Sequence, residues 1–119
     1  MSAHVAILSI GGVLLVTVPA DLDETALASL QEELSSQIMK KGAHGVLIDI
    51  TGVQVVDTFV GGRISVIASV ARLLGARPVL VGMRPAVAQT LVQLGVELDG
   101  ITRARDLDAG LLALGTRSA

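Results

Sequence analysis

The fold is decided by residues 47–62, which have the sequence LIDITGVQVVDTFVGG. Its first four residues complete the run at residues 45–50, which is apolar apart from Asp49. Such a run is expected of a strand buried on both faces of a largely parallel sheet. Asp57 is a good N-cap residue, so a helix is predicted from about Asp57 to Leu74. The segment therefore predicts a strand, a loop and a helix that carries a hydroxyl, that of Thr58, in its first turn.

The residues before this segment predict a hairpin followed by a helix. Two apolar runs flank a Gly-Gly pair at residues 11–12, and a two-residue glycine turn is typical of a β-hairpin. Asp21, with Glu24 three residues later, resembles the capping box of a helix that should reach about Lys41. The apolar runs are residues 5–10 and 13–18, and the apolar face of the helix comprises Leu27, Leu30, Leu34 and Ile38.

The residues after the segment predict one more buried strand and two short helices. The strand is expected over residues 78–83, and Pro85 then stands where a first helical residue would. The helices are expected over residues 85–94 and 104–114, the latter with Asp106 near its start. Residues 115–119 are expected to fray. The order of these elements predicts the α/β class.

Length and composition indicate a single domain, residues 1–119, with a core of aliphatic side chains. The chain is 51% hydrophobic but only 1% aromatic, and Phe59 is its one aromatic residue. Cysteine is absent, and we find neither a signal sequence nor an apolar run of about 20 residues, so we expect a cytoplasmic protein that does not cross a membrane. The net charge of −2 argues against a nucleic-acid partner.

The chemistry of the side chains argues against an enzyme. The two histidines, His4 and His44, are predicted to be surface residues beside strand starts, with no obvious catalytic partner. No HExxH, GxSxG or phosphate-loop pattern occurs, which also disfavours a flavodoxin-like metabolic enzyme. We therefore expect no catalytic residues, no metal and no cofactor.

Thr58 is the candidate for a regulatory site. In the first helical turn, unpaired backbone amides and the positive end of the helix dipole favour a phosphate, whose charge of about −1.5 to −2 would change the surface. The simpler interpretation is a threonine that helps to start a helix. From Thr58, a stripe of mostly small polar residues follows one edge of the predicted helix, so that a partner can approach closely. The stripe comprises Thr58, Gly62, Ser65, Ser69 and Arg72.

Apolar residues cover more of the same helix than one core contact needs, which predicts that part of it meets another chain and that the protein self-associates. These residues are Phe59, Val60, Ile64, Val66, Ile67, Val70, Leu73 and Leu74. The alternative is a well-buried helix with a thin solvent-exposed edge.

Several segments resemble the STAS domain family and, within it, stressosome scaffold proteins of the RsbS type. The resemblance extends from about Val5 to Leu114. It implies a mixed central sheet with an N-terminal hairpin and about four helices, mainly on one face. The matching segments are Pro19-Ala20-Asp21-Leu22-Asp23, Ile48-Asp49-Ile50-Thr51, Asp57-Thr58-Phe59, Leu74-Gly75-Ala76 and Gly82-Met83-Arg84-Pro85-Ala86-Val87-Ala88.

The resemblance also implies a function. A scaffold of this type sequesters an RsbT-like switch kinase, assembles with an RsbR-like co-antagonist, and releases the kinase when the residue at Thr58 is phosphorylated; an RsbX-like phosphatase resets it. The family usually has serine at this position, so Thr58 is a departure. Partner contacts are expected at Asp57, Phe59, Gly62, Ser65 and Ser69. Asp49 is expected to support the switch, although Asp49 and Asp57 can also act only in turn and cap hydrogen bonds. The alternative function is a STAS module that binds a nucleotide or an anion at the same helix start.

Overall fold

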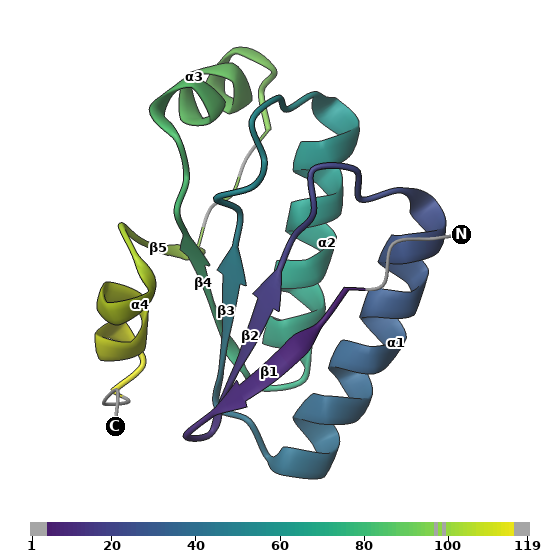
Figure 1. Ribbon diagram of the computed structural model, residues 1–119, viewed down its shortest axis with the longest axis vertical. Helices are drawn as coiled ribbons and strands as arrows, with labels where there is room; N and C mark the ends of the chain where they lie inside the picture. The colour runs from purple at the N-terminus through teal and green to yellow at the C-terminus, as the bar shows by residue number, and fades with distance from the viewer. Residues whose placement is uncertain (1–4, 97, 99, 116–119) are drawn as a thin grey trace.

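A computed structural model describes residues 5–96, 98 and 100–115. Within this part of the chain, five strands form one sheet in the order β1-β2-β3-β4-β5 (Figure 1). β1 is antiparallel to β2, and the remaining neighbours are parallel. The strands are β1 (Ile7–Ile10), β2 (Val13–Thr17), β3 (Gly45–Asp49), β4 (Arg77–Val81) and β5 (Thr102–Ala104), and the helices are α1 (Glu24–Lys41), α2 (Thr58–Leu73), α3 (Pro85–Gln93) and α4 (Leu107–Ala113).

The direction of the strand crossovers determines which face each long helix covers. α1 connects β2 to β3, and α2 connects β3 to β4, so both connections step the same way across the sheet. Because such crossovers are right-handed, both helices must lie on the same face, as Figure 1 shows. α4 follows the last strand and crosses nothing, and it packs on the opposite face against β3, β4 and β5.

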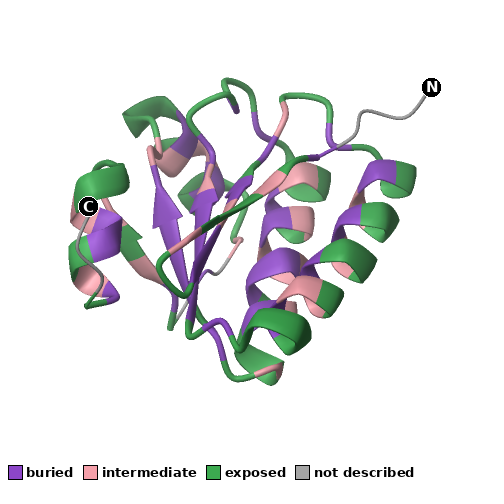
Figure 2. Cartoon of the chain, turned by 60° about the horizontal axis from the view of Figure 1, so that its bottom comes forward, coloured by how far each residue is buried: buried purple, intermediate pink, exposed green. Residues whose placement is uncertain are grey.

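The core consists of two clusters, one on each face of the sheet. The larger cluster joins the strands to α1 and α2, and the smaller one joins them to α4 (Figure 2). The second face is only partly covered, since Leu8 on β1 is 58% exposed. Burying one Leu or Ile side chain contributes roughly 1.5–3 kcal/mol, so these layers supply most of the stabilisation. The clusters include Leu14, Ile48, Leu80, Leu34, Ile64 and Ile67 on the first face and Val13, Leu47, Val79, Leu111 and Leu114 on the second.

The structure confirms the mixed sheet, the N-terminal hairpin and the two long helices on one face. At the hairpin turn, Gly11 and Gly12 have φ values of 52° and 82°, a left-handed conformation that glycine adopts without steric cost. Within the described residues, no helix is both long and apolar enough to span a membrane.

Two boundaries predicted from the sequence are wrong. The N-cap of α1 is Asp23, not Asp21, because the Asp23 side chain accepts a hydrogen bond from the Ala26 amide at 2.7 Å. The predicted helix over residues 104–114 is shorter: its first residues belong to β5 and to the Asp106 cap. The frayed end was predicted for residues 115–119, of which 116–119 lie outside the described residues.

Candidate functional site

The start of α2 presents Thr58 to solvent. Asp57, the N-cap, accepts a hydrogen bond on its carboxylate from the Val60 amide at 2.9 Å, and its carbonyl accepts from Gly61 at 3.0 Å. Thr58 is therefore the first helical residue, and it is exposed. Among the described residues, the Thr58 and Phe59 amides have no hydrogen-bond partner. The hydroxyl thus stands beside free donors at the positive end of the helix dipole.

The loop between β3 and α2 is held by buried side chains along its length and by hydrogen bonds at its β3 end. Ile50, Val53 and Val56 are buried in the larger core cluster, and two exposed residues separate each from the next. The Ile50 amide donates to the Val81 carbonyl at 3.0 Å, and Arg84 Nε donates to the Thr51 carbonyl at 3.1 Å. The loop that leads to Thr58 is therefore tied to the neighbouring loop after β4, and its position is fixed by the core.

Asp49 closes the turn at the end of β3. Its Oδ1 accepts from the Thr51 amide at 2.9 Å and from the Thr51 hydroxyl at 2.6 Å. Gly82 lies against this pair with φ of 76°, and a Cβ at Gly82 would collide with the Thr51 hydroxyl. The Asp49 carboxylate thus bonds to Thr51, in the same loop that leads to Thr58.

The predicted polar stripe forms the solvent-facing edge of α2. Thr58, Gly62, Ser69 and Arg72 are exposed and Ser65 is half-buried. A Cβ added to Gly62 would meet nothing within 4 Å. The packing of this chain therefore does not require a glycine at Gly62, and a second molecule could come close to the helix backbone there.

Apolar side chains border Thr58. Phe59 is 70% exposed and Val55, in the preceding loop, is 83% exposed. The guanidinium of Arg63 lies 6.0 Å from the centroid of the Phe59 ring and donates to the Leu22 carbonyl at 2.8 Å. Leu73, near the other end of α2, is 86% exposed. Phe59 and Val55 thus expose apolar side chains within three residues of Thr58 in the sequence.

Sequence reasoning missed the exposed Val55 and the contacts of Arg63 with the Phe59 ring and the Leu22 carbonyl. No local sequence pattern indicates that Val55 is exposed or that Arg63 reaches Leu22. His44 is exposed, as predicted, but it has a structural partner: its Nε2 lies 3.1 Å from the Leu114 carbonyl. His4 lies outside the described residues.

Comparison with known proteins identifies the class. The model of the STAS domain family matches residues 4–105, and the chain belongs to this family. Within it, the relatives at 35% identity or more include an RsbT co-antagonist, an RsbS protein and a chain from a structure of the stressosome.

Three relatives define this branch. RsbRA of Bacillus subtilis, an RsbT co-antagonist, is 39% identical over 90 residues, which cover 76% of this chain and 33% of that protein. A serine-to-glutamate variant of RsbS from Moorella thermoacetica superposes with a TM-score of 0.80 at 36% identity, covering 95% of this chain and 96% of that one. A chain from a structure of the stressosome, described as a signal integration and transduction hub, has a TM-score of 0.82 at 35% identity and covers 92% and 96%.

The RsbR and RsbS relatives differ in how much of their own length this chain covers. This chain spans about a third of the length of the curated RsbR relatives that it matches. It matches nearly the whole of the RsbS chain.

Proposed function

We propose that the chain is a non-enzymatic stressosome scaffold that sequesters an RsbT-like switch kinase and releases it when Thr58 is phosphorylated. The observation that carries the proposal is the exposed Thr58 hydroxyl in the first turn of α2, beside an edge of small residues that the fold itself does not use. Catalysis belongs to the kinase, and this chain supplies the acceptor and the docking surface.

The geometry explains how phosphorylation could act as a switch. The free amides and the dipole at the start of α2 tolerate a phosphate, so the domain stays folded. The kinase would contact Asp57, Phe59, Gly62, Ser65 and Ser69 in the unmodified state. A new charge in this desolvated contact lacks a partner, and such a charge costs about 2–5 kcal/mol, an affinity loss of more than tenfold.

Thr58 in place of the usual serine adds a methyl group beside the acceptor oxygen. β-Branching restricts the side-chain rotamers of threonine. We infer that this chain is phosphorylated at the same position but more slowly than a serine protein. Asp49 supports the acceptor indirectly, because its bonds to Thr51 fix the loop that ends at Asp57.

The remaining partners follow from the family. The RsbR co-antagonists among the relatives, and the stressosome structure that this chain matches, support assembly with an RsbR-like protein and self-association into a large complex. The exposed apolar side chains Val55, Phe59 and Leu73 support the same inference. An RsbX-like phosphatase would remove the phosphate. The alternative of a nucleotide- or anion-binding module is not favoured, because the relatives at 35% identity or more are stressosome proteins.

The test is a calorimetric titration of purified RsbT-like kinase into the wild-type chain and two variants, Thr58→Ala and Thr58→Asp. Wild type and Thr58→Ala should bind equally, and Thr58→Asp should bind at least tenfold more weakly. Melting curves control for misfolding, since a carboxylate at this helix start should leave stability unchanged or raise it by about 0.3–1 kcal/mol. Equal affinity for all three folded proteins would contradict the proposal.

A further inference from the structure

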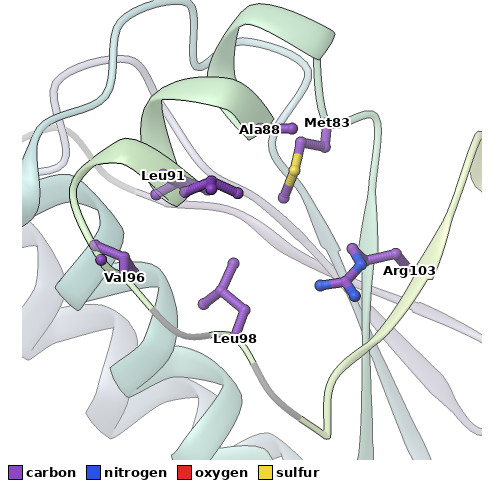
Figure 3. A pocket seen from close by; sticks show the side chains of 8 residues that line it. Met83, Ala88, Leu91, Val96, Leu98 and Arg103 are labelled. Carbon is purple, nitrogen blue, oxygen red and sulfur yellow. The ribbon is translucent and has the colours of Figure 1, made fainter.

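A cavity of about 490 Å³ lies between α3, the residues Gly95, Val96 and Leu98 that follow it, and β5 (Figure 3). Its volume is in the range of small-molecule sites. The walls are almost entirely aliphatic. The lining residues are Met83, Ala88, Leu91, Val92, Gly95, Val96, Leu98 and Arg103.

The side chains that line the cavity differ in burial. Leu91 and Leu98 are buried, Met83, Ala88 and Val96 are half-buried, and Val92, Gly95 and Arg103 are exposed. The one aromatic side chain, Phe59, is exposed on α2 and is not among the lining residues. The aliphatic walls offer hydrophobic contact to a ligand.

Among the described residues that line the cavity, Arg103 is the only charged one. Figure 3 shows its guanidinium turned toward the space between Met83 and Leu98. Among the described residues, no carboxylate pairs with it. A guanidinium offers a planar pair of donors that matches a carboxylate in a bidentate geometry. An apolar cavity with one cation therefore matches a molecule with one carboxylate and a hydrocarbon body.

We propose that this cavity is a binding site for a medium-chain aliphatic carboxylate. The carboxylate pairs with Arg103, and the hydrocarbon chain lies among Met83, Leu91 and Leu98. At about 30 Å³ per non-hydrogen atom, taking water in the liquid as a guide, the cavity holds roughly 16 such atoms. A chain of about eight to ten carbons fits within that limit.

The wall of the cavity touches the helix that carries Thr58. Leu91 and Val96 pack against Gly61, because a Cβ there would lie 3.0 Å from Leu91 Cδ2 and 3.2 Å from Val96 Cγ1. A ligand that contacts Leu91 and Val96 is thus one side chain away from the first turn of α2. The Gly61 amide provides a local reporter of binding, and the binding proposal does not depend on the proposed function.

The experiment is a calorimetric titration of the full chain with hexanoate, octanoate and decanoate, and with octanol as the uncharged control. One saturable site should appear, and each added methylene pair should tighten binding about 15-fold, or fourfold per methylene. Octanol should bind at least tenfold more weakly than octanoate, because it lacks the charge-assisted hydrogen bonds to Arg103. Octanoate should also shift the amide resonance of Gly61.

Matched variants locate the site. Arg103→Gln should weaken octanoate binding at least tenfold, while Arg105→Gln, at an exposed arginine that does not line the cavity, should not. Ala88→Leu fills the cavity and should abolish binding, while Ala86→Leu, at an exposed position of the same helix, should not. Absence of saturable binding, or equal losses in Arg103→Gln and Arg105→Gln, would overturn the proposal. Arg103 is exposed, so Arg103→Gln should leave the fold intact. The comparison of Arg103→Gln with Arg105→Gln therefore remains decisive even if Ala88→Leu lowers stability.

Discussion

The two faces of α2 differ most clearly at Gly61 and Gly62, which are neighbours in the sequence. Gly61 is buried, and a Cβ there would press on Leu91 and Val96. Gly62 is exposed, and a Cβ there would meet nothing within 4 Å. Gly61 cannot carry a larger side chain without displacing Leu91 of α3 and Val96. Nothing in the described part of the chain requires Gly62 to be small, and the proposed partner contact supplies a reason.

The largest effect on stability is expected for Gly61→Leu. The added side chain must displace Leu91 and Val96, and overpacking of this kind costs about 1–3 kcal/mol. Urea unfolding measures the change. A urea midpoint equal to that of the wild type would show that α3 moves aside without loss of stability. Gly61 would then be no more constrained than Gly62.

The matched control is the same substitution one residue later. Gly62→Leu places its side chain in solvent, so the free energy of unfolding should not fall. The same variant should lose affinity for the kinase, because the larger side chain keeps the partner from the helix edge. A large loss of stability in Gly62→Leu would mean that the outer face has an internal packing role after all.

A smaller loss of stability is expected for Asp57→Ala. This variant removes the acceptor of the Val60 amide, and losing an N-cap costs about 1 kcal/mol. Asp57→Asn keeps an acceptor and should retain most of the stability. Thermal melting of both variants tests the role of Asp57. A lower melting temperature for Asp57→Ala than for Asp57→Asn indicates a helix cap, whereas a residue that only contacts partners would leave both unchanged. Equal melting temperatures for Asp57→Ala and wild type would show that the cap does not contribute.

The smallest effect, with the opposite sign, is expected for Gly62→Ala. Replacing an exposed helical glycine by alanine stabilises by roughly 0.5–1 kcal/mol, because the unfolded chain loses freedom. The measurement is the free energy of unfolding from urea titration. A destabilised Gly62→Ala would refute the assignment of an open outer face.

Much of this architecture could be predicted from the sequence. The continuous apolar runs at β3 and β4 and the Asp57 cap of α2 are local patterns, and the structure confirms them. β5 was missed because Thr102–Ala104 contains no apolar alternation and is a strand only through its pairing with β4. Asp21 and Asp23 are both plausible caps, and only the backbone path decides in favour of Asp23.

The site could be predicted only in part. Thr58 and the polar stripe follow from helical spacing, and the structure brings them onto one exposed edge of α2. The sequence could not separate Gly61 from Gly62, because that difference depends on α3, which lies far along the chain. The bond between Asp49 and Thr51, and the cavity at Arg103, likewise depend on how loops and later segments come together.

The central claim is that Thr58 is the phosphate acceptor whose modification releases the kinase. The most direct measurement is incubation of the complex with the RsbT-like kinase and magnesium ATP, followed by mass-spectrometric mapping and a pull-down at each time point. We predict phosphate confined to Thr58, kinase release in step with it, and an unmodified Thr58→Ala variant that retains the kinase. Phosphate on another residue with Thr58 unmodified, or release of the kinase from Thr58→Ala at the wild-type rate, would contradict this account.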